Sequence, residues 1–284
     1  MMTVINTNIG ATIARNAIGT NERSMATSME RLSTGLRINS AKDDAAGLAI
    51  ASRMTAQVST LNMGVRNAND AISMIQTVEG ASKEISNMLV RMKELAVQAN
   101  SETYSTTDTD ALNLEYQALL AEITRVQANT KWNGMALMDN AAAGTANTVS
   151  VQLGDSANNV TIKDWSITGS GSVLNGLTGT AITDTTRALA TTKATAAITA
   201  LDAAITLATT EQATYGSEIA SLTHAADNLT NVSANTDQSR SRIQDADYAV
   251  EATNLARTQI IAQASTAMLA QANQSKQSVL ALLQ

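Results

Sequence analysis

Apolar residues recur at alternating spacings of three and four in three stretches of the chain. These stretches run from residue 71 to 95, from 112 to 126 and from 198 to 229. Their rod-seam positions include Met74, Val78, Ile85, Met88, Leu95, Ile219 and Leu222, and only Gln212 interrupts the third stretch. A 3.5-residue period keeps one apolar stripe facing a partner helix. The pattern therefore predicts long helices that pack as coiled-coil rods.

The period changes between the second and third stretches. Val149, Val151 and Leu153 alternate with polar residues, and Val160 and Ile162 resume the alternation. A period of two is typical of a half-buried strand. Half of the 14 glycines lie between residues 134 and 179. We therefore predict a small β-hairpin region within 131–186, in a fold that is otherwise mainly α.

Both ends of the chain carry thinner apolar stripes. Met25, Met29, Leu32 and Leu36 form a short seam near the start, and Ile260, Ile261, Met268 and Leu269 are the apolar anchors near the end. Apolar burial must exceed the entropy lost on ordering, and isolated helices are marginal in water. Our hypothesis is that both ends are mobile in the free chain and become ordered only in an assembly.

The composition fits long, closely packed helices. Hydrophobic residues make up 44%, aromatic residues only 2%, and Pro is absent, which removes the commonest interruption of a helix. Cys is also absent, which excludes disulfides and thiolate metal sites. A net charge of −6 argues against nucleic acid as a partner. No apolar run is long enough for a membrane span, and the first residues do not resemble a cleavable secretory signal.

Candidate catalytic chemistry is sparse. His224 is the only histidine and lies off the apolar stripe, so we interpret it as a surface residue. Asp245 and Asp247 invite a metal or acid–base interpretation, but the neighbouring Arg240 and Arg242 favour ion pairs. Residues 131–186 contain no His or Cys and few carboxylates. We expect no enzyme activity, no catalytic or metal site and no cofactor.

Four sequence strings resemble those of bacterial flagellins. They are Asn6-Thr7-Asn8, RLSTGLRINSAKDDAAGLAIA at 31–51, SRSRIQDADYAVE at 239–251 and AMLAQANQ at 267–274. The resemblance covers roughly residues 3–135 and 195–284. It implies an inner domain of paired terminal helices around a channel, and a surrounding domain of long antiparallel helical coiled-coil rods with a small β-element.

The domain boundaries follow from this comparison. Residues 1–45 and 239–284 would form the inner helical domain, with a connecting spoke at the end of the first segment. Residues 46–130 and 187–238 would form the rods, and 131–186 the β-region. Outer domains are expected to be absent or vestigial, because 131–186 leaves little room for them.

The spoke is placed at Ser33 to Ala46, because Gly35 and Gly47 are unfavourable inside a helix. The alternative is a continuous helix that tolerates one glycine. Residues around the spoke, all but Leu32 charged or polar, are candidates for contacts between subunits, and a solvated face is the alternative. The candidates are Arg31, Leu32, Arg37, Asn39, Lys42, Asp43, Asp44, Arg240, Arg242, Asp245 and Asp247.

Residues 90–97 resemble the flagellin segment that a vertebrate Toll-like receptor binds. By that resemblance Arg91, Leu95 and Glu115 would be the central receptor contacts. Leu95 also belongs to the first apolar seam, so this surface is interpreted first as an assembly surface.

The sequence thus predicts an extracellular structural subunit that polymerises with itself into a flagellar filament for motility. The resemblance implies export as an unfolded chain through the flagellar secretion apparatus. It also implies an export chaperone, a filament cap and hook-associated proteins as partners. The alternatives are a hook–filament junction protein, a hydrolase on a flagellin frame and an unrelated coiled-coil adaptor. Ser and Thr of the middle region are open to glycosylation, but no motif establishes it.

Overall fold

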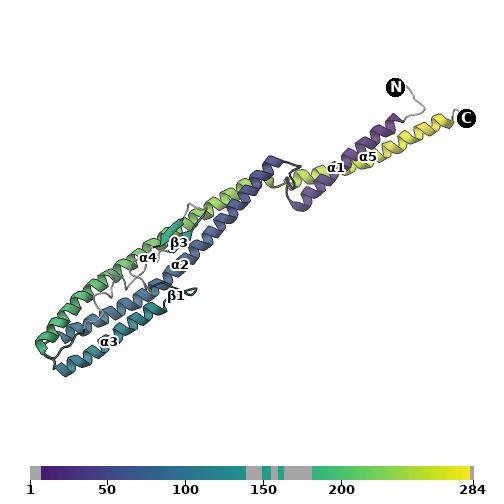
Figure 1. The fold of residues 1–284 in the computed structure, drawn as a ribbon. Coiled ribbons are helices and arrows are strands. Elements are labelled where there is room, and N and C mark those ends of the chain that lie inside the picture. The colour runs from purple at the N-terminus through teal and green to yellow at the C-terminus, as the bar shows by residue number, and fades with distance from the viewer. Residues whose placement is uncertain (1–7, 139–148, 155–158, 163–180, 282–284) are drawn as a thin grey trace. The chain divides into compact units, whose positions relative to one another are not determined.

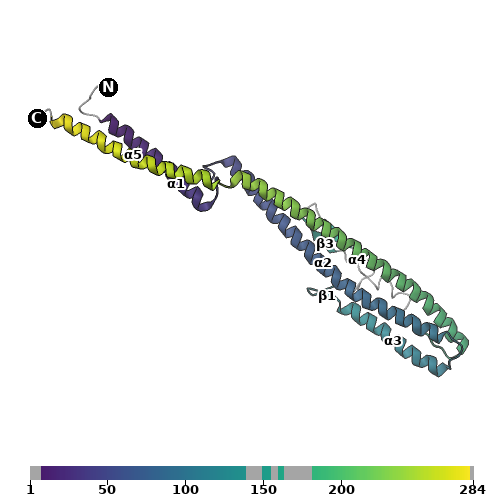
Figure 2. The same cartoon turned by 180° about the vertical axis from the view of Figure 1, so that it is seen from behind.

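A computed structural model describes residues 8–138, 149–154, 159–162 and 181–281. The helices are α1 (Ile9–Thr34), α2 (Ala45–Ala99), α3 (Thr106–Asn129), α4 (Arg187–Gln244) and α5 (Tyr248–Ala281). The strands are β1 (Lys131–Trp132), β2 (Met135–Ala136), β3 (Val149–Gln152) and β4 (Asn159–Ile162). This confirms a mainly α fold with a small β-region (Figures 1 and 2).

The chain divides into two compact units. Unit 1 comprises Met1–Val58 and Ala234–Gln284, and unit 2 comprises Ser59–Ser233. None of the described helices is long and apolar enough to cross a lipid bilayer.

The hydrophobic core lies in unit 2, where α2 runs between α3 and α4 (Figures 1 and 2). Tyr116 of α3 and Tyr215 of α4 are fully buried in it. The α4 side of the core is built largely from small residues, which allow helices to approach closely: Ala194, Ala197, Ala204 and Ala208 are all buried. Long helices with small side chains on their inner faces therefore make a narrow but continuous core.

The seam positions fall on the inner faces of these helices. Met74, Val78, Ile85, Leu95 and Leu222 are buried, and Met88 and Ile219 are half-buried. The helix α2 also buries a second column that the spacing did not reveal, with Ala68, Ile75, Leu89 and Ala96 at 0% exposure. A helix packed between two neighbours needs two apolar columns, and a single heptad seam describes only one of them.

Two short antiparallel hairpins make up the β-region. The β1–β2 turn places Asn133 and Gly134 at φ values of 48° and 82°, the left-handed conformation of a tight two-residue turn. Strands β3 and β4 pair in register from Val149–Ile162 to Gln152–Asn159. The predicted strands at 149–153 and 160–162 are therefore confirmed.

The β3–β4 hairpin sits on α2. The side-chain amide of Asn67 donates a 2.8 Å hydrogen bond to the Gln152 carbonyl. One turn earlier in α2, Gly64 is buried directly against the Leu153 carbonyl, and a Cβ at this position would overlap that oxygen. The absence of a side chain at Gly64 is what lets the strand end approach the helix so closely.

In unit 1, α1 and α5 lie side by side along their length (Figures 1 and 2). The residues that these two helices bury in the described structure are polar: Asn21, Ser28 and Glu251. Large apolar side chains lie outside instead, with Ile13 at 63%, Ile260 at 67% and Met268 at 69% exposure. This helix pair has no apolar core of its own among the described residues.

The segment from Gly35 to Asp44 is not helical. Gly35 ends α1 in the left-handed conformation (φ 73°), and its amide donates to the Arg31 carbonyl at 2.8 Å. By contrast, Gly47 lies inside α2, where a Cβ would stand 2.7 Å from Cδ1 of the buried Ile38. The two glycines on which the spoke prediction was based thus have different effects: Gly35 ends a helix, and Gly47 allows close packing.

Candidate functional site

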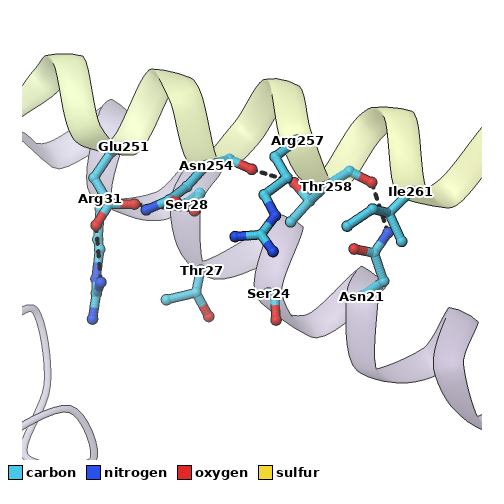
Figure 3. A pocket seen from close by; sticks show the side chains of 10 residues that line it. All are labelled: Asn21, Ser24, Thr27, Ser28, Arg31, Glu251, Asn254, Arg257, Thr258 and Ile261. Carbon is cyan, nitrogen blue, oxygen red and sulfur yellow. Dashed lines mark hydrogen bonds and ion pairs between the residues drawn. The ribbon is translucent and has the colours of Figure 1, made fainter.

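A series of polar contacts joins α1 to α5. The amide of Asn8 donates to the Ala272 carbonyl at 3.5 Å, and the amide of Asn21 donates to the Thr258 carbonyl at 2.7 Å. Further along, Glu251 accepts hydrogen bonds from Ser28 at 3.0 Å and from Arg31 at 2.9 Å (Figure 3). Each step toward the end of α1 is matched by a step toward the start of α5. Directional contacts at matched positions fix the antiparallel register of the pair, as a buried polar residue does in a coiled coil.

Glu251 is the best-buried charged group of this helix pair, at 6% exposure. Burial alone would raise the pKa of its carboxyl group, but the hydrogen bonds from Arg31 and Ser28 and the charge of Arg31 outweigh it. The pKa of Glu251 is therefore lowered, and the side chain is a carboxylate at neutral pH.

Two grooves run along the same helix pair. The first, of about 430 Å³, is lined by polar residues between Asn21 and Arg31 and between Glu251 and Ile261 (Figure 3). The second, of about 450 Å³, is apolar, and it is lined by Gly10, Ile13, Ala14, Ala17, Ile261, Ala264, Ser265, Met268 and Ala272. Exposed apolar surface of this kind is typical of a site where apolar side chains of another molecule pack.

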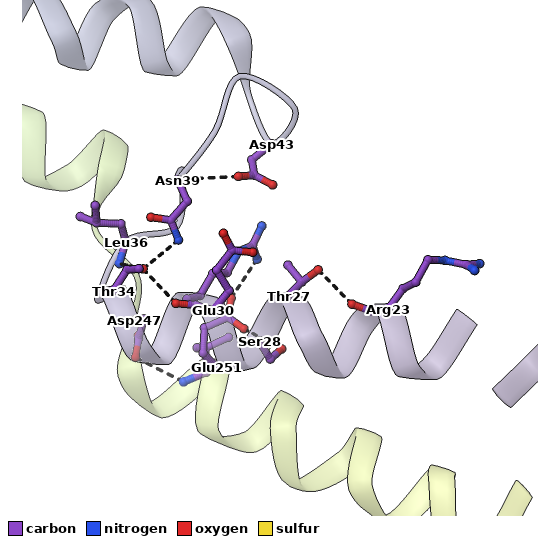
Figure 4. A network of polar contacts seen from close by, with 12 residues as sticks. Arg23, Thr27, Ser28, Glu30, Thr34, Leu36, Asn39, Asp43, Asp247 and Glu251 are labelled. Carbon is purple, nitrogen blue, oxygen red and sulfur yellow. Dashed lines mark hydrogen bonds and ion pairs between the residues drawn. The ribbon is translucent and has the colours of Figure 1, made fainter. Parts of the chain in front are cut away.

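The connecting segment after α1 is ordered by its own side chains. Asp43 accepts hydrogen bonds from the backbone of Asn39 and Ser40, and Asn39 donates to the Thr34 hydroxyl at 2.8 Å (Figure 4). The backbone hydrogen bond from Ser40 is the main reason why the pKa of Asp43 is lowered. Asp44 accepts from the Gly47 amide at 2.9 Å and so caps the start of α2.

Backbone contacts hold this segment to the end of α4 and to the two residues that follow it. Leu36 forms an antiparallel bridge with Asp245, and the Ala246 amide donates to the Gly35 carbonyl at 2.9 Å. Arg37 donates to the Gln244 carbonyl through its amide, at 2.7 Å, and to the Ile243 carbonyl through its guanidinium group, at 2.6 Å. Arg37 therefore has contacts within the chain, whereas Lys42 is exposed and Leu32 is half-buried.

Among the described residues of one copy, the arginines and aspartates at 240–247 do not pair with one another. Arg240 pairs with Asp237 at 2.7 Å. Asp245 instead accepts from the Ser241 hydroxyl at 2.6 Å, and Asp247 caps α5 by accepting from the amides of Ala249 and Val250. Arg242 is exposed. The short side chain of Asp247 stands directly before the start of α5, where backbone amides have no partner within the helix.

On unit 2, Arg91 and Glu115 form an exposed ion pair at 2.9 Å, and Arg91 also pairs with Glu94 at 3.0 Å. Leu95, expected beside them, is 1% exposed and points into the core. Lys93 pairs with Asp202 of α4. His224 is exposed, as predicted. Within the described ranges, no cluster of His, Cys, Asp and Glu is arranged to hold a metal ion.

Sequence reasoning missed the polar contacts between α1 and α5. Asn21 and Ser28 are seven residues apart, which is the spacing of one helix face. The predicted seams consist of apolar residues, and a repeat of polar residues was therefore not recognised as a buried helix face. A seam defined by Asn21 and Ser28 would have predicted the buried face of α1.

Comparison with known proteins identifies the family to which the chain is similar. The family model for the bacterial flagellin N-terminal helical region matches residues 5–143, and that for the C-terminal helical region matches residues 198–283. A flagellin of Halalkalibacterium halodurans is 41% identical over 280 residues, covering 99% of both chains. A flagellin of Bacillus subtilis is 37% identical over 302 residues, covering 98% of this chain and 99% of the relative.

Solved structures are similar as well. A Bacillus cereus flagellin crystal structure has 36% identity and a TM-score of 0.48 over 58% of this chain and 88% of that one. A flagellar hook-associated protein from Vibrio parahaemolyticus has 13% identity and a TM-score of 0.59 over 72% of this chain and all of that one, a likeness of fold alone.

Proposed function

The chain belongs to the bacterial flagellin family and is a structural subunit of the flagellar filament, and we propose that unit 1 acquires its core from neighbouring copies during polymerisation. Unit 2 folds around a core of its own. Unit 1 offers complementary surfaces that one copy leaves open.

The observation that carries this proposal is the placement of apolar residues on α1 and α5. The described face between these helices buries Asn21, Ser28 and Glu251, while Ile13, Met29, Ile260 and Met268 are each more than half exposed. Burial of apolar area contributes about 25 cal/mol per Å², so exposed stripes of this kind gain most of their stability only when another molecule covers them. The apolar groove beside them gives a neighbour somewhere to insert.

Such contacts join different surfaces of successive copies. Where the rotation between copies does not close a ring, contacts of this type produce an open helical polymer. Residues 1–45 and 239–284 would then form the inner layer of the filament, 46–130 and 187–238 the rods around it, and 131–186 a small β-region without outer domains. Because unit 1 is completed only in the polymer, folding of the ends is coupled to assembly.

The remaining partners follow from the same role. We assign the chain to the extracellular flagellum and expect no enzyme activity. It would reach the flagellum by export as an unfolded chain, with the help of a chaperone. Hook-associated proteins and a cap would meet the two ends of the filament. The exposed Arg91–Glu115 pair supports a receptor-accessible surface on unit 2, with Leu95 acting through the core beneath it.

The test is truncation of the full chain. Deletion of residues 1–30 or 265–284 is expected to abolish polymerisation on filament seeds, while the far-ultraviolet helical signal of unit 2 remains. Sedimentation and electron microscopy measure the polymer. Met268→Ser in the apolar groove should also impair elongation. Its matched control, Leu189→Ser at a 52% exposed position of α4, should not.

Filament formation by both truncated chains at the normal rate would contradict the proposal. Growth that stops after a thin layer on the seeds would instead support a junction protein, which does not polymerise indefinitely.

A further inference from the structure

The polar groove between α1 and α5 contains more positive than negative charge. It is lined by Arg31, Arg257 and a single carboxylate, Glu251. Arg31 and Glu251 form an ion pair at 2.9 Å, which neutralises both. Arg257 is exposed and has no ion-pair or hydrogen-bond partner among the described residues. Its guanidinium group is directed toward α1, on the side of Ser24 and Thr27 (Figure 3).

The two arginines of the groove carry hydrogen-bond donors that are not used within the chain. The Arg31 Nε–H is buried and has no hydrogen-bond partner in the part of the chain that the structure describes. Arg257 adds a whole guanidinium group. The hydroxyls of Ser24 and Thr27 already donate to the carbonyls of Thr20 and Arg23 and can only accept further bonds. Guanidinium donors beside an uncompensated positive charge match an acceptor that carries a negative charge, and a carboxylate fits both requirements.

Most carboxylates of unit 1 are already engaged within the chain. Those with contacts are Asp43, Asp44, Asp237, Asp245, Asp247 and Glu251. Glu22 and Glu30 of α1 are exposed, and neither carboxylate has a partner among the described residues. Unit 1 thus contains a groove whose free donors could bind a carboxylate, and two carboxylates that have no partner among its described residues.

The helix geometry favours Glu30 over Glu22. Ser28 faces α5, and a residue two positions later is rotated by about 200° around the helix, onto the opposite side. Glu22 follows the inward-facing Asn21 by one position and lies about 100° away, on the flank. A carboxylate on the far side of α1 cannot reach the groove of its own copy, but it can reach the groove of another.

We propose that the groove lined by Arg31 and Arg257 binds the Glu30 carboxylate of a second copy of the chain. This inference rests on the proposed polymerisation and specifies one of its contacts. The pairing joins the back of one α1 to the α1–α5 groove of the next copy, which is the heterologous type of contact that an open polymer requires. Its charge complementarity also sets which face of the incoming copy is accepted.

Charge reversal in the full chain tests the pairing by the rate of seeded elongation. Arg257→Glu and Glu30→Arg are each expected to slow elongation roughly tenfold or more, because like charges then meet in the groove. The double variant restores the opposite charges and is expected to elongate within about threefold of wild type. Arg53→Glu, a reversal at another exposed arginine of unit 1, serves as the matched control and should elongate normally.

The outcomes separate this pairing from the polymerisation itself. Arg257 is exposed and without an intrachain partner, so the helical signal of the dilute variant should equal that of wild type. Normal elongation by Arg257→Glu overturns the pairing, and so does failure of the double variant to recover. Rescue of Arg257→Glu by Glu22→Arg overturns the assignment to Glu30. Each of these results leaves the effect of the terminal deletions, and with it the proposed function, unchanged.

Discussion

At the scale of single residues, Glu251 makes the stability of the contact between α1 and α5 depend on pH. Its pKa is lowered in the folded pair by Arg31 and Ser28, which outweigh the effect of burial. A carboxyl group with a lowered pKa stabilises the folded state fully above its unfolded pKa of about 4.3. That contribution disappears as the pH falls through the folded value. The α1–α5 contact therefore weakens on the acid side and is intact at neutral pH.

The substitution Glu251→Gln removes this titration. Filaments of the variant are expected to dissociate more readily than wild type at pH 7, and the difference between the two should shrink toward zero as the pH falls below about 4. Sedimentation of filaments across a pH series measures it. Glu79→Gln, at an exposed position of unit 2, should show little difference at any pH. A difference in filament dissociation between wild type and Glu251→Gln that stayed constant across the pH series would contradict this dependence on Glu251 titration.

At the scale of elements, the contact between α2 and the β3–β4 hairpin depends on a missing side chain. In Gly64→Ala the new Cβ would overlap the Leu153 carbonyl, which is backbone and cannot rotate away. We expect a loss of about 1–3 kcal/mol in the unfolding free energy, as for overpacked interiors. Urea unfolding followed by circular dichroism measures it.

The matched control lies on the same helix. A Cβ at Gly80 would meet no atom within 4 Å, so Gly80→Ala should stabilise α2 by about 0.5–1 kcal/mol. Equal effects of the two substitutions would show that helix propensity alone, and not the hairpin contact, governs position 64.

The elements also show what apolar spacing can and cannot predict. The seams through Val78, Tyr116 and Leu222 were found because each helix of unit 2 buries a regular stripe in the same molecule. The second column of α2, represented by Ile75 and Leu89, was missed because a helix between two neighbours has two inner faces.

Polar sites were harder to predict. Asp245 and Asp247 were interpreted through charge, yet Asp245 accepts from the Ser241 hydroxyl of α4 and Asp247 accepts from an amide at the start of α5. The Asn21 and Ser28 face was missed because it is polar. Contacts of this kind depend on where helices begin and on which groups come within 3 Å, and a linear pattern encodes neither.

At the scale of the whole molecule, the two units should differ in local stability. Unit 2 has a core of fully buried side chains, whereas the described face of α1 on α5 is held by polar contacts. In dilute subunit we expect strong amide-exchange protection in the inner helices of unit 2 and weak protection in α1 and α5. The α1 and α5 amides should become protected once filaments form. Strong protection of α1 in the dilute subunit would show that the helix pair is self-sufficient.

The outward placement of Ile13, Ile260 and Met268 has a consequence for genetics. Melting curves of purified subunits report on the core around α2 and would rate many substitutions on α1 and α5 as harmless. Their cost would emerge only where copies stack, as shorter fibres and slower swimming. Variant surveys based on expression or thermal shift would therefore overlook damage that a motility assay detects at once.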